Sequence, residues 1–165
     1  MMKLQTKTLP KAQRGAGLII HYDILDCQGR ALLVGQTENG SVCFAGFTNV
    51  VETILTYYPK AALHKAIRGG VDVEKCNFYA EGTDLQVKVW HELLKISKGQ
   101  TITYKELAKR VGKPQAVRAI GNAVGANPIS VYIPCHRVLH TQGNKIGYAW
   151  GADVKENLLK AEGVF

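Results

Sequence analysis

The ten residues Ile129–Val138, in the order Ile-Ser-Val-Tyr-Ile-Pro-Cys-His-Arg-Val, carry the most chemical information in this chain. Apolar residues alternate with polar ones from Ile129 to Ile133, which predicts a short strand. Pro134 cannot donate a ladder hydrogen bond, so we expect it to end that strand. Cys135 and His136 follow at a fixed point of the backbone. A thiol needs a base or a positive charge nearby to become a thiolate near neutral pH, so the pair is a candidate nucleophile and base.

The surrounding residues decide between this interpretation and a buried structural cysteine. Asn127-Pro128 precedes the cysteine, and Gly147-Tyr148 and Trp150-Gly151 follow it. The run resembles the O6-alkylguanine-DNA alkyltransferase family and is most similar to the alkyltransferase half of the bacterial adaptive-response protein. The resemblance covers most of residues 82–163, because matching positions continue upstream at Gly82-Thr83, Gln86, Val89-Trp90, Gly99, Thr101, Thr103-Tyr104, Leu107-Ala108, Gly112, Pro114 and Val117-Arg118-Ala119.

The composition is that of an ordinary soluble protein, with 46% hydrophobic and 21% charged residues in a chain of 165. This length allows one compact domain or two small ones. No apolar stretch approaches the roughly 20 residues of a membrane span. No secretory signal is visible near the N-terminus, so we expect a cytoplasmic protein that makes no membrane contact.

The four cysteines, Cys27, Cys43, Cys76 and Cys135, form no close pair with the spacing of a metal site. In a reducing compartment we expect them to be free thiols. Some members of the family hold a structural zinc in the N-terminal half, but the histidines and cysteines of this chain do not reproduce that ligand pattern. The sequence therefore predicts no metal and no cofactor.

The net charge of +8 is unevenly distributed along the chain. Residues 84–165 hold 12 Lys and Arg against 6 Asp and Glu, and residues 1–83 hold 9 against 7. Excess positive charge favours a partner with a phosphate backbone, because binding releases the counterions condensed on it. A charge excess is also typical of a solvated surface, so it supports DNA binding only because the motifs lie in the same half.

The N-terminal half predicts a small sheet with one helix. Residues 1–16 are polar and basic and predict a mobile lead-in. Strands are expected at residues 18–27, 31–37 and 42–47, with an Asn-Gly hairpin turn before the third and an edge strand at 71–76. A short helix is expected at residues 50–57. The resemblance implies a ribonuclease-H-like structural domain at residues 1–80, and an overall α+β fold.

The C-terminal half, residues 81–165, predicts a mainly helical domain. Apolar residues recur at helical spacing in residues 84–95. Thr103 and Glu106 form a capping-box pattern for a helix to Arg110, which Gly112 ends. Pro114 is expected in the first turn of the next helix, which reaches about Gly125. These two short helices predict a helix-turn-helix, and a last helix is expected at residues 153–162.

The second helix of the pair is the expected DNA-binding element. One of its faces carries small residues that permit a close approach, with Arg118 as the long cation at its centre. The resemblance implies that this helix enters the minor groove of double-stranded DNA and that Arg118 fills the gap left by an extruded nucleotide. A phosphate contact or a surface ion pair is the alternative role of Arg118. The expected DNA-binding residues are Arg118, Thr103, Ala119, Gly121 and Asn122.

The resemblance also implies roles in alkyl transfer. Cys135 accepts the alkyl group, His136 removes the thiol proton through a water molecule, and Glu162 orients the histidine. Tyr104 donates a hydrogen bond to N3 of the guanine, and Asn127 ties the recognition helix to the cysteine loop. The expected wall of the base pocket comprises Val138, the loop at residues 141–148 with Tyr148, and Ala149, where the adaptive-response relatives have arginine.

The resulting expectation is a DNA-repair methyltransferase that transfers the alkyl group of O6-alkylguanine, and of O4-alkylthymine, to Cys135 once and irreversibly, as a monomer. Three alternatives remain: a protein that binds alkylated DNA without transfer, a helix-turn-helix regulator, and a Cys-His-Glu hydrolase. The first class lacks the acceptor cysteine. The regulator would need a dimerisation segment that is not visible, and the hydrolase leaves the basic half unexplained.

Overall fold

The computed structural model describes residues 3–65, 75–140 and 147–164. The chain divides into two compact units, Met1–Val87 and Lys88–Phe165. A mixed sheet with short helices forms the first unit and a group of helices forms most of the second, which is an α+β fold. No helix within the described residues is both long and apolar enough to cross a membrane.

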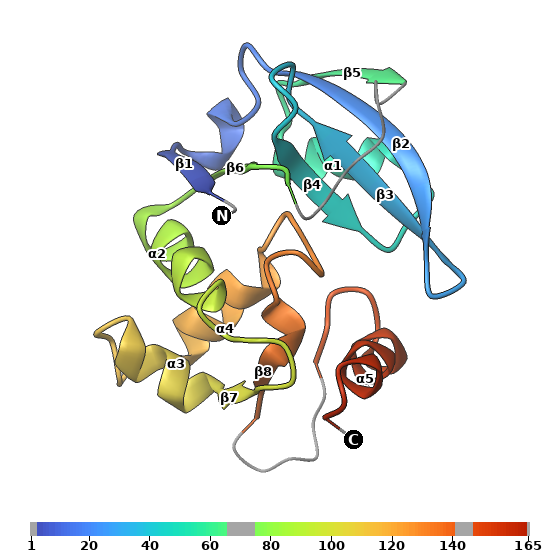
Figure 1. The fold of residues 1–165 in the computed structure, drawn as a ribbon. Helices are drawn as coiled ribbons and strands as arrows, with labels where there is room; N and C mark the ends of the chain where they lie inside the picture. Colours follow the sequence, from blue (N-terminus) through green and yellow to red (C-terminus); the bar gives the residue numbers. More distant parts are fainter. Residues whose placement is uncertain (1–2, 66–74, 141–146, 165) are drawn as a thin grey trace. The chain divides into compact units, whose positions relative to one another are not determined.

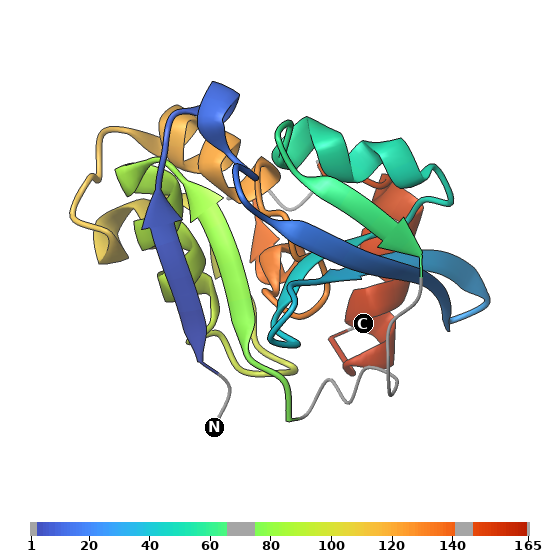
Figure 2. The ribbon, with the colours of Figure 1, turned by 90° about the horizontal axis from the view of Figure 1, so that it is seen from above.

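The first unit is built on a mixed sheet with the strand order β1-β6-β4-β3-β2-β5. The antiparallel centre consists of β2 (Ile19–Cys27), β3 (Arg30–Gln36) and β4 (Val42–Gly46), which follow one another through tight turns. Parallel pairs complete both edges, with β1 (Leu4–Thr8) on β6 (Phe78–Gly82) and β5 (Ala62–Lys65) on β2. Figure 2 shows these two edge pairs clearly.

A short helical segment, the 3-10 turn Val51–Thr53 followed by α1 (Ile54–Tyr57), packs on this sheet. Tyr58 is fully buried at its end and donates a hydrogen bond of 2.7 Å to the carbonyl of Cys43 in β4. Gly35 in β3 leaves room for the side chain of Ile20 in β2, because a Cβ there would lie 2.8 Å from Ile20 Cγ2. The core of this unit is mainly apolar, and the Tyr58 hydroxyl is hydrogen-bonded within it.

The three central strands, their Asn-Gly turn and the short helix confirm the sequence prediction to within one or two residues. The mobile lead-in is wrong, because residues 4–8 form β1 and pair along their whole length with β6, and Lys11–Gln13 form a 3-10 turn. Strand β1 lies at an edge of the sheet, where polar side chains are favoured. Its sequence therefore lacks the alternation of apolar residues from which a strand is predicted. Most of the edge strand expected at residues 71–76 lies outside the described residues.

The second unit contains the helices α3 (Tyr104–Arg110), α4 (Val117–Gly125) and α5 (Ala152–Ala161), and most of α2 (Asp84–Leu93). A parallel pair of two-residue strands, β7 (Ile102–Thr103) and β8 (Val138–Leu139), joins the start of α3 to the end of the cysteine segment. The buried indole of Trp90 in α2 donates a hydrogen bond of 3.0 Å to the carbonyl of Ala123 in α4. Figure 1 shows α3 and α4 joined by a short connection.

Two predictions for this unit are wrong. Pro114 lies in a turn, and α4 begins only at Val117, because the amide of Ala116 closes a turn on the carbonyl of Lys113 first. Residues 129–133 form a tight turn and no strand, with the amide of Ile133 donating to the carbonyl of Ile129 and Val131 at φ +72°. Apolar residues alternate equally well in a buried turn. The nearest strand, β8, comes after Cys135, whereas the predicted strand came before it.

Candidate active site

Cys135 lies in a cavity of about 300 Å³ in the second unit. Cys135 is 6% exposed and is the first residue of the 3-10 turn Cys135–Arg137. The lining is mostly apolar and small, with polar groups from a few side chains, which suits a flat organic group. The described residues that line it are Tyr104, Gly121, Val124, Gly125, Asn127, Ser130, Cys135, Gly147, Tyr148 and Ala149.

Asn127 holds the turn that presents the cysteine. Its side-chain oxygen accepts from the amide of Ile129 at 3.0 Å, and its Nδ2 donates to the carbonyl of Ile133 at 2.9 Å. The buried amide thus replaces the ladder hydrogen bonds of a strand and links the end of α4 to the residues before Cys135. It also forms a hydrogen bond with the thiol that favours the thiolate.

Burial raises the pKa of the Cys135 thiol above its ordinary value. The Asn127 amide, the positive charge of Lys155 and a hydrogen bond from Tyr148 act in the opposite direction without cancelling this effect. The resting sulfur is therefore a thiol near neutral pH, and it must lose its proton when it reacts. The arrangement needs a base that is itself neutral at that pH.

His136 has the properties of such a base. It is fully buried, and its Nε2 lies 2.8 Å from Glu162 Oε1. A carboxylate at Nε2 fixes the tautomer with the proton on that nitrogen, which leaves Nδ1 as the acceptor. No described residue bonds to Nδ1. Burial lowers the pKa of His136, and Glu162 offsets this only in part, so the ring is neutral near pH 7.

Glu162 also receives two hydrogen bonds from Arg137, at 3.0 Å from Nε and 2.8 Å from Nη2. Arg137 Nη1 donates to the carbonyl of Ile96 at 2.6 Å. Burial acts to raise the pKa of Glu162, but the bonds from Arg137 and His136 outweigh it and the pKa is lowered. The carboxylate is thus ionised and locked in place. Sequence reasoning missed Arg137, although its position beside the Cys-His pair was a signal.

Lys155 of α5 is the second residue that sequence reasoning missed. Its side chain is fully buried, and no carboxylate of the described residues lies within ion-pair distance. Nζ donates to the carbonyl of Val138 at 2.6 Å and to that of Gly147 at 3.1 Å, and it lies 5.9 Å from the centre of the Tyr104 ring. Burial lowers its pKa to about 8, against the attraction of Cys135. Only its place on the buried face of the last helix distinguished it in the sequence.

Tyr104, Tyr148 and Ala149 line the cavity, as expected for a base pocket, whereas Val138 is buried behind it and offers Lys155 its carbonyl. Burial raises the pKa of Tyr104, and Cys135 adds to this, so the phenol keeps its proton. Of the expected loop wall at residues 141–148, residues 141–146 lie outside the described residues. The indole of Trp150 donates to Ser130 Oγ at 2.8 Å and ties the far end of this segment to the cysteine turn.

The residues expected to bind DNA lie on α4 and before α3. Arg118, Ala119 and Asn122 are exposed, and Gly121 packs against the Tyr104 ring. Thr103 Oγ1 accepts from the amide of Glu106 at 3.0 Å, so it caps α3 as predicted and keeps its hydroxyl proton for another acceptor. The described structure therefore brings Cys135, His136, Glu162, Asn127 and Tyr104 together and places Arg118 on the adjoining helix surface.

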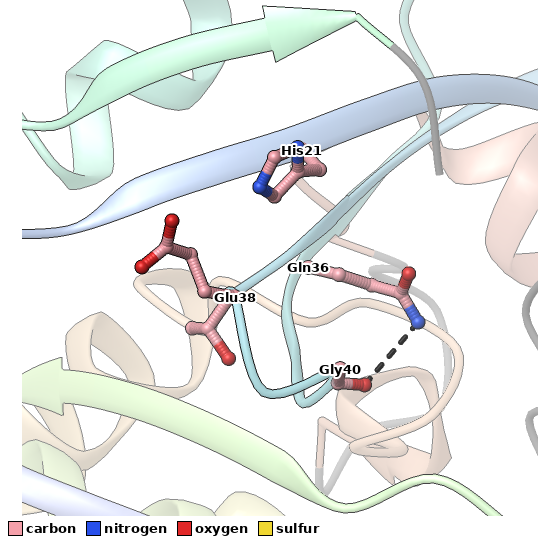
Figure 3. A pocket seen from close by; sticks show the side chains of 5 residues that line it. His21, Gln36, Glu38 and Gly40 are labelled. Carbon is pink, nitrogen blue, oxygen red and sulfur yellow. Dashed lines mark hydrogen bonds between the residues drawn. The ribbon is translucent and has the colours of Figure 1, made fainter. Parts of the chain in front are cut away.

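The first unit has its own hollow, lined by His21, Gln36, Thr37, Glu38 and Gly40 (Figure 3). Gln36 there donates to the carbonyl of Gly40 at 3.2 Å. This hollow contains no nucleophile paired with a base. Among the described residues, no three His, Cys, Asp or Glu side chains gather closely enough to hold a metal ion.

Comparison with known proteins places the chain among DNA methyltransferases. Residues 84–164 match the family model described as the DNA-binding domain of 6-O-methylguanine DNA methyltransferase. The methylated-DNA–protein-cysteine methyltransferase of Methanosarcina barkeri is 55% identical over 82 residues, which are 50% of this chain and 52% of that protein. The enzyme of the same name from Candida albicans is 57% identical over 83 residues, 50% of this chain and 46% of that protein.

Two solved structures extend the likeness over both units. The Mycobacterium tuberculosis O6-methylguanine methyltransferase is 32% identical with a TM-score of 0.69, and the alignment covers 87% of this chain and 92% of that one. Mycobacterium tuberculosis OGT in complex with DNA is 30% identical with a TM-score of 0.70, covering 86% and 92%. The chain spans about half the length of the curated relatives that it matches. On the 32% identity over nearly the whole of a solved relative, this chain belongs to the O6-methylguanine-DNA methyltransferase family.

Proposed function

We propose that this protein repairs DNA by moving the alkyl group from O6 of an alkylated guanine, or from O4 of an alkylated thymine, onto Cys135. The observation that carries the proposal is the position of Cys135 in a cavity of about 300 Å³, next in sequence to a buried histidine whose Nε2 lies 2.8 Å from a carboxylate. Relatives named methylated-DNA–protein-cysteine methyltransferase support the same assignment.

The chemistry is an in-line displacement at the alkyl carbon. The bond from Sγ to that carbon forms while its bond to O6 breaks, and the electron pair of the broken bond leaves with the guanine. His136 takes the thiol proton through a water molecule, and Glu162 and Arg137 hold the ring and stabilise its charge. The proton taken from the thiol passes from His136 through water to the departing guanine, and a hydrogen bond from Tyr104 to N3 stabilises the charge that develops on the base.

The thioether product does not return to a thiol, since no described cysteine of the second unit other than Cys135 is present to relieve it. Each molecule therefore acts once. Asn127 positions the cysteine turn, and Val138, Tyr148 and Ala149 shape the pocket around the base. Catalysis in this sense is stoichiometric, with the protein as the final acceptor.

We infer that α3 and α4 act as a helix-turn-helix whose second helix lies in the minor groove of duplex DNA. A stacked, paired guanine cannot reach a buried thiol, so the nucleotide must be extruded. Arg118 fills the gap in the stack, while Thr103, Ala119, Gly121 and Asn122 contact the groove and the backbone. The 12 Lys and Arg against 6 Asp and Glu of residues 84–165 support an anionic partner.

We further infer that the two parts of the chain divide the work. Residues 81–165 bind DNA and accept the alkyl group, and residues 1–80 form a ribonuclease-H-like structural domain. The protein acts in the cytoplasm as a monomer without an obligatory protein partner, a membrane or a cofactor. The hollow at His21 takes no part in the reaction.

The test is intact-mass analysis after incubation with a duplex that carries one O6-methylguanine. We expect one added methylene, about 14 Da, on the peptide that contains Cys135. Cys135→Ala abolishes the addition, whereas Cys27→Ala, which removes a half-buried thiol of the first unit, leaves it unchanged. Methyl uptake by Cys135→Ala contradicts the assignment of the acceptor. Tight binding to the methylated duplex without any mass change favours a protein that only marks damage.

A further inference from the structure

A second cavity of about 530 Å³ lies at the surface of the same unit, and its rim is chemically different from the cysteine pocket. Its rim carries the guanidinium of Arg118, the amide of Asn122 and the imidazole of His140, and Tyr104, Val117 and Gly121 complete the lining. No carboxylate is among the described lining residues. A concave surface that offers several donors, one positive charge and no carboxylate favours an anion.

The two cavities adjoin, because Tyr104 and Gly121 line both of them. A nucleotide whose base enters the cysteine pocket must leave its sugar and flanking phosphates outside that pocket. The surface cavity is the space next to its entrance, so the backbone of the damaged strand passes there. This step rests on the proposed function.

His140 is held in a defined position at this rim. Its ring centre lies 4.9 Å from that of Tyr104, at an angle of 41° between the planes. The residue is exposed, and no hydrogen bond to a described residue occupies its ring nitrogens. The contact with Tyr104 therefore orients the ring and leaves its N–H available for a ligand. The Tyr104 ring also lies 5.9 Å from Lys155 Nζ.

We propose that His140 is a DNA-binding residue that donates a hydrogen bond to a phosphate flanking the extruded nucleotide. Arg118 from the neighbouring helix enters the duplex, and His140 holds the strand from which the base has turned out. The groups that face His140 are Tyr104 from α3, Arg118 and Asn122 from α4 and Gly147, since a Cβ there would lie 3.9 Å from His140 Nε2.

The test measures the affinity for a duplex with O6-methylguanine in a Cys135→Ser background that prevents transfer. His140→Phe keeps an aromatic ring against Tyr104 and removes the donor. We expect it to weaken binding about 3- to 10-fold, because a hydrogen bond to a charged phosphate is lost.

His91→Phe is the matched control, because His91 is an exposed histidine of α2 outside both cavities. It should leave the affinity unchanged. His140→Gln, which keeps a side-chain donor, should retain most of the parent affinity. Equal affinities of the parent and His140→Phe, or an equal loss of affinity in His91→Phe, overturn the proposal.

Intact-mass analysis of the unmodified protein with the same duplex separates this proposal from the proposed function. Methyl uptake together with an unchanged affinity for His140→Phe means that the phosphate contact alone is wrong. Absence of methyl uptake means that the transfer function is wrong, and the affinities still decide whether His140 binds DNA phosphate. No binding by any variant overturns both.

Discussion

At the scale of single residues, the site combines a thiol and an imidazole that are both neutral at rest. Burial raises the pKa of Cys135 and lowers that of His136, so neither side chain carries its charge before the reaction. Because the thiolate is the form that is readily oxidised, this arrangement protects Cys135 from oxidation before it reacts. Deprotonation then depends on His136, which Glu162 and Arg137 hold in place.

The pH dependence of the transfer rate should report the base. Because the pKa of His136 is lowered, we expect the single-turnover rate to persist below the ordinary histidine pKa and to fall only on further acidification, as the ring becomes protonated. Glu162→Gln should lower the rate about 100-fold, since the histidine loses its orienting carboxylate. Rapid-quench kinetics from pH 5 to 8 measure both. A rate that rises on acidification contradicts a neutral base.

Lys155 makes a separate prediction about stability. Its pKa of about 8 lies below the ordinary value of 10.5, so the unfolded chain binds more protons than the folded one between these values. The stability of the parent protein relative to Lys155→Met should therefore rise with pH across that window, by up to about 3 kcal/mol, and stay constant below it. Urea unfolding at pH 7 to 10 measures the difference. A pH-independent difference means that the ammonium has an ordinary pKa.

At the scale of elements, side-chain hydrogen bonds and one pair of two-residue strands hold the segments around Cys135 in place. Two residues of β7 pair with two of β8, and this brings the start of α3, with Tyr104, next to the cysteine turn. Lys155 holds the carbonyls of Val138 and Gly147, on either side of the loop between them. The geometry of the pocket therefore depends on a few buried polar contacts more than on extended secondary structure.

Arg118 on α4 should matter for duplex DNA and not for the chemical step. Arg118→Ala is expected to slow transfer from a methylated duplex about 10- to 100-fold, because nothing then replaces the extruded nucleotide in the stack. Transfer from free O6-methylguanine base should stay within about twofold of the parent, since Arg118 lines the surface cavity and not the cysteine pocket. An equal loss with both substrates contradicts the role. Arg110→Ala, a cation at the end of α3, is the control.

The elements also mark where sequence reasoning succeeds and fails. The capped helix after Thr103 and the hairpins follow from local signals of few residues, whereas the place of Glu162 beside His136 was implied by the family resemblance. The turn at residues 129–133 could not be predicted, because the Asn127 side chain supplies the bonds that the alternation assigned to a strand. Lys155 could not be recognised as buried, since its partners are carbonyls far away in the sequence, which carry no side-chain signature.

At the scale of the whole molecule, charge and architecture are divided along the chain. The second unit carries the nucleophile, its base and most of the excess positive charge, and the first unit is a sheet closed by its own apolar core. Sequence reasoning placed the boundary between residues 80 and 81, because the motifs begin near residue 82, and the contacts divide the chain between Val87 and Lys88. The same reasoning did not predict the polar strand β1.

The uneven charge should make DNA binding strongly dependent on salt. We expect the affinity for undamaged duplexes to vary little with sequence and to fall at least tenfold between 50 and 200 mM salt, through counterion release. Fluorescence anisotropy with duplexes of different sequence measures this. Binding that is insensitive to salt contradicts an interface made mainly with phosphates.

The left-handed backbone of Val131 has a consequence for the lifetime of the protein. A β-branched residue at φ +72° costs about 1–2 kcal/mol relative to one that tolerates this conformation. If each molecule is spent after a single repair, as proposed, the capacity for repair equals the number of folded copies, and a strained turn lowers the stability of each copy. Position 131 is thus the place where a longer-lived reserve can be engineered without altering any group that handles the damaged base.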